Sequence, residues 1–574
     1  MKKLITLAWL CLCLCNYTHA QNYIIQDSVM IKTPSGSILS AVVVRKSETE
    51  KPLPTALMFF IYANTARSIQ EATYAADRGY VGIVADTRGK RLSPDTVKPY
   101  ENEVDDVNAV IDWIVAQPWS NGEVGMYGGS YSGFAQWAAL KNPHPALKTI
   151  VPYVAAIPGQ GLPMENNVFL NANYQWAFHV TNNKYVDDSV NIDHDRWRKM
   201  RSNWYQTGVA YNKIDSVDGT KNPWLQKWLL HPSYDSYWQA MVPYEKDFKR
   251  INIPILSITG YYDDGQISAL QYLTEHYKYN PNANHYLIIG PYDHFGAQIG
   301  GTPVVNGYRV DSVALISTRK ITFSWLDYVI KGGPKPELLK DKINYEVMDA
   351  NQWLHAPSIS AMSNKRLRLY LSSEMRNNNP ILSPVKPKKK NYHEQLVDLA
   401  DRKSSNNDYY PDPIINDELD QSNGLFFISD PFEQEISING FFTGKLLASI
   451  NKKDMDFGVV LYELTPEGKY FHLSYFLGRA SYLRDATKRQ LLKPNKLETL
   501  PFEKTRLVSK KLQKGSRLVV VLNIDKNPFA QINYGTGKDV SLETIQDAKS
   551  PLRIKWFDES YVEIPINVDS SAIN

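Results

Sequence analysis

The sequence predicts an α/β domain followed by an all-β domain. Up to about residue 335, short apolar runs alternate with amphipathic helical segments, which is typical of a parallel sheet covered by helices. Beyond that point the hydrophobic period changes to two, which is typical of exposed-and-buried strands. The chain has 574 residues, of which 43% are hydrophobic and 22% are charged. This composition supports more than one buried core and excludes a disordered or fibrous protein.

The first twenty residues have the pattern of a secretory signal peptide. Lys2 and Lys3 precede an apolar run, and Thr18 and Ala20 place small residues where a signal peptidase requires them. The apolar run is shorter than the roughly 20 residues that a membrane-spanning helix needs. We therefore expect residues 1–20 to be cleaved, leaving a secreted or periplasmic protein without a membrane segment.

Charge and cysteine content exclude several classes of function. The chain has 64 Lys and Arg against 60 Asp and Glu, and removing Lys2 and Lys3 leaves 62 against 60, a net charge of +2. This balance gives no reason to expect nucleic acid as a partner. All three cysteines lie within 1–20, so the mature chain lacks thiol nucleophiles, disulfides and zinc–thiolate sites. The acidic cluster around His194 is interpreted as solvated surface, and we predict neither a metal nor a cofactor.

The α/β domain is predicted to span 21–335. A helix is expected where Val104, Val107, Val110, Ile111 and Ile114 recur at three- and four-residue steps. A last helix at about 321–330 should end at the Gly-Gly-Pro sequence 332–334. Buried strands are expected at the apolar runs 55–61, 81–85, 124–127, 149–155, 253–259 and 286–289.

The alternation stops between 158 and 248, where six of the thirteen tryptophans fall among many tyrosines. We interpret this segment as a helical cap inserted into the α/β domain. Its rings either fill the cap's own small core or line a pocket for an apolar group. The sequence does not decide between these two roles for any single ring, and Trp176 is one candidate for the pocket.

Residues 336–574 are predicted to form an all-β sandwich. Leu367, Leu369 and Leu371 alternate with polar neighbours, and 552–556 repeats the pattern. The polar stretch 377–423 is expected to be a long surface loop.

A candidate nucleophile lies in the segment 128–133, which reads GGSYSG. The segment follows the predicted strand 124–127 and leads into the helix-forming run 134–140. A serine at a tight strand-to-helix turn needs small residues two places on either side, and Gly128 and Ser132 meet that need. The pattern therefore predicts Ser130 as the nucleophile.

The partners of a nucleophilic serine are a base and an acid that orients the base. On this type of scaffold they follow in the chain order Ser, Asp, His, each after a strand. His294 follows the run 286–289, whereas His285 precedes it and should lie at the opposite edge of the sheet. Asp263 and Asp264 both follow 253–259, and spacing favours Asp263 only weakly.

An oxyanion hole requires two hydrogen-bond donors. The backbone N–H of Tyr131, directly after the nucleophile, is one candidate. Tyr62, which ends the run 59–61, is the other, because a phenol can donate a hydrogen bond. A tyrosine that merely caps a strand would explain Tyr62 equally well.

These residues resemble the CocE/NonD hydrolases, a family that includes cocaine esterase, α-amino acid ester hydrolases, glutaryl-cephalosporin acylases and X-Pro dipeptidyl-peptidases. The resemblance covers essentially the whole mature chain. It implies an α/β-hydrolase fold with a jelly-roll domain beside the active site, Asp263 as the acid, and Tyr62 as the phenolic donor. The motifs are the GxSYxG elbow, QPWSNG at 117–122, HPSYDSYW at 231–238, GYYD at 260–263, GPYDH at 290–294, and NQW at 351–353, the expected entry to the β domain.

The predicted function is that of an exported serine hydrolase that cleaves an ester or amide bond through an acyl-enzyme. Its partner would be a small ester or amide, or a short peptide. An X-Pro dipeptidyl-peptidase is the alternative enzyme. The alternative outside enzymes is a ligand-binding β-sandwich protein that carries an inactive hydrolase domain. The natural acyl and leaving groups and the oligomeric state stay open.

One departure from the family bears on the substrate. The α-amino acid ester hydrolases that this chain resembles bind the substrate's ammonium group with carboxylates, two of them two and three places after the catalytic Asp. Here those places hold Gly265 and Gln266, while Glu165 in the cap lies near the position of the third. Glu165, Gln266 and Trp176 are therefore the candidate pocket residues. We predict an enzyme that needs no free α-amino group, although Glu165 or Asp264 could still supply a carboxylate.

Overall fold

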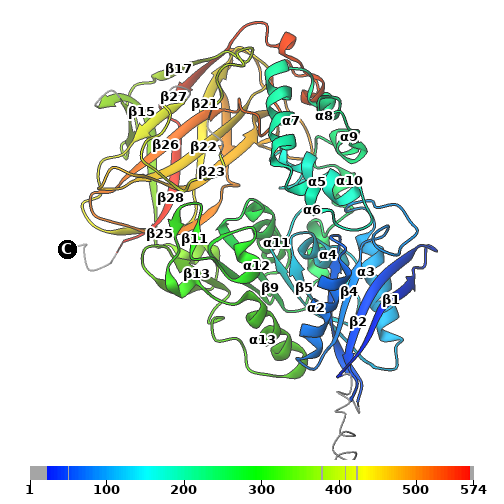
Figure 1. Cartoon of the computed structure of the whole chain (residues 1–574). Coiled ribbons are helices and arrows are strands. Elements are labelled where there is room, and N and C mark those ends of the chain that lie inside the picture. The colour runs from blue at the N-terminus through cyan, green and yellow to red at the C-terminus, as the bar shows by residue number, and fades with distance from the viewer. Residues whose placement is uncertain (1–21, 49–50, 377–378, 407–408, 422–423, 569–574) are drawn as a thin grey trace, which may run out of the picture.

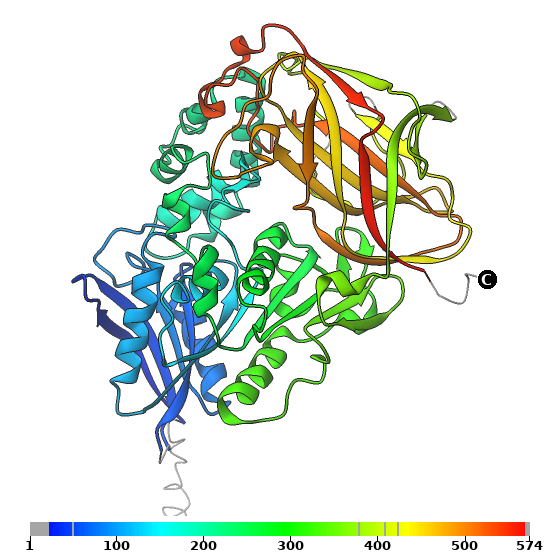
Figure 2. The same cartoon turned by 180° about the vertical axis from the view of Figure 1, so that it is seen from behind.

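The computed structural model describes residues 22–48, 51–376, 379–406, 409–421 and 424–568. A mixed sheet with its helices forms one end of the molecule, and a β-sandwich and a helical cap lie side by side at the other (Figure 1, and from behind in Figure 2). The predicted signal peptide lies outside the described residues. In the part of the chain that is described, no helix combines the length and apolar character needed to cross a bilayer.

The first domain is built on a sheet that has ten strands among the described residues, in the order β1-β2-β4-β3-β5-β6-β9-β10-β13-β14. Neighbours from β4 to β13 are parallel, whereas β1, β2 and β14 pair antiparallel. The carboxyl ends of the parallel strands therefore meet at one edge, where catalytic groups collect in such sheets. The strands are β1 (Tyr23–Lys32), β2 (Ile38–Lys46), β3 (Leu53–Phe60), β4 (Val81–Asp86), β5 (Ser120–Gly129), β6 (Leu147–Tyr153), β9 (Ile255–Tyr262), β10 (His285–Asp293), β13 (Ile343–Val347) and β14 (Gln352–Ala356).

Helices cover both faces of this sheet. Helices α2 (Thr65–Ala76) and α13 (Thr318–Lys331) pack together through the rings of Tyr74 and Phe323, whose centroids lie 5.2 Å apart. Helices α3 (Glu103–Val115), α4 (Tyr131–Ala139) and α11 (Gln266–Tyr279) form the other layer. In that layer Trp137 of α4 stacks on Tyr272 of α11 at 4.3 Å. Aromatic contacts therefore join helices within each layer.

The α/β sheet extends beyond the boundary predicted at residue 335. Gly332 does end α13, with a φ of 69°, but a helix end is not a domain end. The five residues of β13 are buried beside β10, and β14 adds one more strand. The NQW motif therefore lies in the β13–β14 hairpin of this sheet and not at the entry to the β domain.

The segment 158–248 contains helices α5 (Ala172–Thr181), α6 (Asp188–Asn191), α7 (His194–Thr207), α8 (Ile214–Asp218), α9 (Pro223–Leu229) and α10 (Ser236–Gln239). It also contains a short hairpin, β7 (Met164–Glu165) and β8 (Val168–Phe169), that the sequence analysis did not predict. Asn166 and Asn167 form its turn with φ values of 43° and 67°. Asparagine tolerates such values, which two-residue hairpin turns require. Asp193 caps α7 by accepting a 3.1 Å hydrogen bond from the Arg196 N–H, as a surface residue can.

The second domain is a β-sandwich with fourteen strands among the described residues. Phe457 and Trp556, from strands in its two layers, meet in the core at 6.4 Å. The strands are β15 (Lys365–Arg376), β16 (Asn379–Ser383), β17 (Tyr392–Val397), β18 (Ile415–Asn416), β19 (Leu425–Ile428), β20 (Ile436–Phe441), β21 (Thr443–Ile450), β22 (Asp456–Leu464), β23 (Tyr470–Arg479), β24 (Glu498–Phe502), β25 (Leu507–Leu512), β26 (Arg517–Ile524), β27 (Leu552–Phe557) and β28 (Tyr561–Asn567).

The prediction of one long loop at 377–423 was wrong. Strands β16, β17 and β18 fall within this stretch. Strand β17 lies at the end of the strand order and has three exposed residues out of six, so its polar composition is that of an edge strand and does not indicate a loop.

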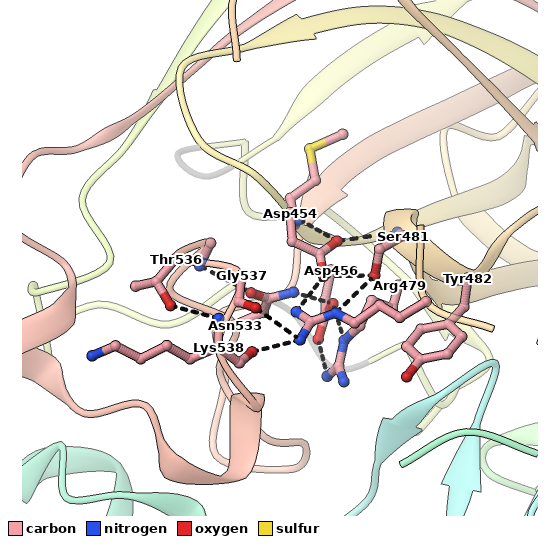
Figure 3. Close-up of polar contacts among 12 residues, drawn as sticks. Asp454, Asp456, Arg479, Ser481, Tyr482, Asn533, Thr536, Gly537 and Lys538 are labelled. Carbon is pink, nitrogen blue, oxygen red and sulfur yellow. Dashed lines mark hydrogen bonds and ion pairs between the residues drawn. The ribbon is translucent and has the colours of Figure 1, made fainter. Parts of the chain in front are cut away.

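A buried polar network joins the cap hairpin to the β-sandwich. Arg479 donates two 2.8 Å hydrogen bonds to Asp456 (Figure 3). It also donates one of 2.7 Å to Gln531. The backbone N–H of Gln531 in turn donates to the carbonyl of Phe169 in β8 at 3.0 Å. Asp454 is bonded to Ser481 in the same network. The arginine neutralises its buried aspartate, as buried charges require, and the hairpin is thereby held against the second domain.

Candidate active site

Ser130 stands at a strained turn between β5 and α4. Its φ of 58° and ψ of −117° are values that a non-glycine residue adopts only where the surroundings impose them. A Cβ at Gly128 would lie 2.7 Å from the Cβ of Ser132, which is why the residues flanking the turn must be small. The strain is typical of a nucleophile elbow, which lifts the serine hydroxyl above the sheet edge.

The loops after β9 and β10 bring an imidazole to a carboxylate. His294 Nδ1 lies 2.9 Å from Asp263 Oδ1. Asp263 is fully buried and accepts further hydrogen bonds from the Thr259 hydroxyl at 2.7 Å and the Gly265 N–H at 3.1 Å. These contacts fix the carboxylate, and through it the imidazole, so that Nε2 can act as the base.

Asp264 lies at the same nitrogen, with its Oδ1 3.2 Å from His294 Nδ1. Its side chain is 57% exposed, whereas that of Asp263 is fully buried. Spacing in the sequence could not decide between the two acids, and in the structure both carboxylates reach the histidine. The better fixed of them is Asp263.

Burial disfavours the charged form of His294, but Asp264 and Asp263 outweigh it and raise the pKa of His294 well above its ordinary value of 6.5. Only the neutral imidazole can accept a proton from serine. Because its pKa is raised, His294 becomes protonated and stops acting as a base at a higher pH than an ordinary histidine would.

Gln298 places the histidine loop beside the elbow. It lies in α12 (Gly296–Ile299), and its amide donates to the His294 carbonyl at 3.0 Å. Its side chain also packs so closely on Gly129 that a Cβ there would clash with it. Gln298 was not predicted, because a glutamine in a short loop helix carries no sequence signal.

The candidate oxyanion donors come from two elements, the end of β3 and the start of α4. Tyr62 follows β3, and its phenol oxygen accepts a 2.8 Å hydrogen bond from the indole N–H of Trp176. Tyr131 is the first residue of α4, where backbone N–H groups have no partner within the helix. Its phenol donates to the buried carboxylate of Glu103 and accepts from the Tyr100 N–H at 3.1 Å. These two hydrogen bonds fix the Tyr131 side chain, and with it the start of α4 next to Ser130.

Glu165 and Gln266 lie at contacts with the β-sandwich. Both oxygens of Glu165 are bound by the guanidinium of Arg506, at 2.5 and 2.7 Å. Gln266 is fully buried, donates to the carbonyls of Gly260 and Leu507 at 2.9 and 3.0 Å, and accepts from the Leu507 N–H at 2.7 Å. Of the three candidate pocket residues, the structure places Trp176 next to Tyr62 and the other two in the domain interface.

Arg506 was not predicted from the sequence. Besides binding Glu165, it donates to the Asp264 carbonyl at 3.2 Å and lies over the ring of Tyr475 at 3.7 Å. It comes from the second domain, far along the chain from both acids, so no local pattern could indicate it. The β-sandwich thereby contacts the loop that carries Asp263 and Asp264.

His285 begins β10 at the opposite edge of the sheet, as expected. Its ring is buried, 2.8 Å from the Ser257 hydroxyl and 3.2 Å from a ring nitrogen of His276.

Within the described ranges, the cluster of acids and histidine close enough to chelate an ion is Asp263, Asp264 and His294, with ligand atoms within 4.8 Å of one another. We assign it to the acid–base pair, because the carboxylates already face the imidazole nitrogen.

The strand order and the strained elbow define the first domain as an α/β-hydrolase. The sequence profile of the X-Pro dipeptidyl-peptidase (S15 family) matches residues 35–296, and that of the X-Pro dipeptidyl-peptidase C-terminal non-catalytic domain matches 339–553. The chain belongs to this family of serine esterases and peptidases, the CocE/NonD and X-Pro dipeptidyl-peptidase family, as its motifs predicted.

The chain is similar to cocaine esterase from Rhodococcus sp. (strain MB1 Bresler), with 22% identity over 569 residues that cover 92% of this chain and 95% of the relative. Among solved structures, an aminopeptidase from the marine sediment archaeon Thaumarchaeota archaeon has a TM-score of 0.77 at 19% identity, covering 95% of this chain and 96% of its own. An α-amino acid ester hydrolase has a TM-score of 0.77 at 22% identity, covering 96% and 97%. These likenesses confirm the predicted fold over nearly the whole chain.

Proposed function

We propose that this protein is an exported serine hydrolase that cleaves an ester or amide bond through an acyl-enzyme. The observation that carries the proposal is the Asp263–His294 contact of 2.9 Å at the same sheet edge as the strained Ser130. Family membership supports hydrolysis, and the site supplies the residues for it. A panel of phenyl esters, β-lactam amides and Xaa-Pro peptides would test the proposal through the rate at which each is turned over.

In the proposed reaction, Ser130 Oγ attacks the substrate's carbonyl carbon while His294 Nε2 accepts the hydroxyl proton. Asp263 stabilises the imidazolium that forms. The oxygen that gains charge is held by the Tyr62 phenol and the Tyr131 N–H. His294 then gives its proton to the leaving group, and water repeats the sequence to release the acid and restore the serine.

The second candidate function is that of an X-Pro dipeptidyl-peptidase, because both matching sequence profiles are named for that activity. The same residues would cleave an amide after proline. Release of Xaa-Pro dipeptides at a higher kcat/KM than hydrolysis of any simple ester in the panel would favour the peptidase.

Replacing Tyr62 with phenylalanine removes one proposed oxyanion donor and preserves the packing of the ring. We expect kcat to fall by about 10²- to 10³-fold while the melting temperature hardly changes. Steady-state kinetics and thermal unfolding of both proteins test this. Unchanged turnover would show that the phenol has only a structural role.

We propose that the substrate needs no free α-amino group. Glu165 is neutralised by Arg506, and Gln266 is bound by backbone groups, so neither is free to receive an ammonium. An unpaired cation in a partly desolvated pocket costs several kcal/mol, on the order of a lost charge-assisted hydrogen bond or more. We therefore expect a phenylglycine ester to be cleaved with a kcat/KM no higher than that of its desamino phenylacetate analogue. A preference for the amine beyond about tenfold, or roughly 1.4 kcal/mol, would contradict this and would point to the exposed Asp264.

Export is a further part of the proposal and is supported by the sequence of residues 1–20 alone. The mature protein recovered from the periplasm or the medium should begin at Gln21. Intact mass measurement decides this, and a cell-associated protein that retains residues 1–20 would contradict cleavage.

A further inference from the structure

We propose that Trp176 is a positioning residue that fixes the phenol of Tyr62 as a hydrogen-bond donor to the oxyanion. The inference rests on the proposed role of Tyr62. Its basis is the 2.8 Å hydrogen bond from the indole Nε1 of Trp176, in α5, to the phenol oxygen of Tyr62, at the end of β3. This contact joins the cap directly to the proposed oxyanion hole.

The chemistry of the two groups settles the direction of this bond. An indole N–H can only donate, whereas a phenol can donate and accept. Trp176 therefore makes the Tyr62 oxygen an acceptor and leaves its proton for another group. Within the residues that the structure describes, Tyr62 donates that proton to no protein acceptor that we identify. In the free enzyme water can accept this proton, because Tyr62 is only partly buried. When substrate is bound, the proposal assigns it to the charge that develops on the substrate oxygen.

Packing fixes the plane of the Trp176 ring. The ring stacks on Tyr100 at 5.2 Å and 21°, on Tyr131 at 6.0 Å and 30°, and on Trp228 at 6.2 Å and 23°. Because the ring cannot turn within this stack, the N–H direction is set before the substrate arrives. Tyr131 also supplies the second proposed donor, so one aromatic cluster orients both groups of the oxyanion hole.

The start of α5 is fixed as well. The backbone N–H of Asn171, directly before the helix, donates to the Phe529 carbonyl of the β-sandwich at 2.7 Å. Trp176 is therefore restrained both by the stacking of its ring and by this backbone hydrogen bond at the start of its helix. A hydrogen bond donated to the phenol oxygen also strengthens the phenol as a donor, because successive hydrogen bonds polarise one another.

A double-mutant cycle with Tyr62→Phe tests the inference. Trp176→Phe deletes the N–H and keeps an aromatic ring in the stack. In the wild-type background kcat should fall about tenfold, the size expected for one neutral hydrogen bond. In the Tyr62→Phe background the same substitution should change kcat by less than twofold, because the group through which Trp176 acts is then absent.

Trp197→Phe is the matched control. It makes the same substitution in the cap and also removes an indole hydrogen bond, the one of 2.8 Å to the Val190 carbonyl, but Trp197 lies outside the stack on Trp176. We expect its kcat to stay within about twofold of wild type. If Trp176→Phe lowers the melting temperature strongly, benzothienylalanine at position 176 keeps the bicyclic ring and removes only the N–H.

Three outcomes would overturn the inference. A wild-type kcat in Trp176→Phe would show that the indole N–H does not contribute to catalysis. An equal loss in both backgrounds would show that the indole acts through packing or direct contact and not through Tyr62. In both cases the proposed catalytic role of Tyr62 would stand. Full activity of Tyr62→Phe alone would remove the proposed oxyanion donor and the positioning role together. The Tyr62→Phe protein therefore distinguishes failure of this inference from failure of the proposed mechanism.

Discussion

Replacing Ser130 with alanine should lower acyl transfer by a factor on the order of 10⁶, because the members of a catalytic triad act as a unit and the nucleophile cannot be bypassed. The fold should persist, since alanine also suits the tight turn in size. Single-turnover kinetics with an activated phenyl ester would measure the loss.

Ser132→Ala is the control for this experiment. Ser132 is buried two residues away, and its hydroxyl donates to the Phe59 carbonyl at 2.7 Å. Its replacement should cost about 1 kcal/mol of stability and leave turnover measurable. Loss of activity in Ser132→Ala together with full activity in Ser130→Ala would reverse the assignment of the nucleophile.

Replacing Asp263 with asparagine should lower kcat about 10⁴-fold, because the amide no longer holds the imidazole in the productive tautomer. Asp264→Asn is its partner variant, since Asp264 lies almost as close to the same nitrogen but is exposed. We expect Asp264→Asn to keep most of the activity at high pH. Equal losses in the two variants would contradict the assignment of Asp263 as the acid.

The pH profiles of the wild-type protein and of the Asp264→Asn variant should also differ. The flanking carboxylates raise the pKa of His294 against the effect of burial. Activity needs the neutral imidazole, so kcat/KM of the wild type should fall as the pH drops through a value above 6.5. Removing the charge of Asp264 removes part of the stabilisation of the imidazolium, and the acid limb should move to lower pH. An acid limb at the same pH in both proteins would show that Asp264 does not affect the pKa of His294.

The parts of the site that depend on local chemistry could be predicted from the sequence. The elbow is specified by small residues around Ser130, and the chain order of acid and base follows from the strand pattern. The choice between Asp263 and Asp264 could not be settled by spacing, because it depends on which side chain the Thr259 hydroxyl and the Gly265 N–H fix.

The parts that depend on contacts between distant segments could not be predicted. Glu165 resembled a free carboxylate until Arg506, from the other domain, proved to neutralise it. The boundary at 335 was placed at a helix end, whereas the sheet continues through β13, which pairs with β10 and is fully buried there. The same limit applies to the cap, where nothing in the sequence could show that Trp176 reaches Tyr62.

The central claim is that Ser130 is the nucleophile of a working hydrolase, and covalent labelling tests it most directly. A fluorophosphonate probe incubated with the wild-type protein should add one phosphonyl group, and peptide mass spectrometry should locate it on Ser130. Ser130→Ala should take up none. An adduct on another serine such as Ser132, or no adduct on a folded wild-type protein, would contradict the account.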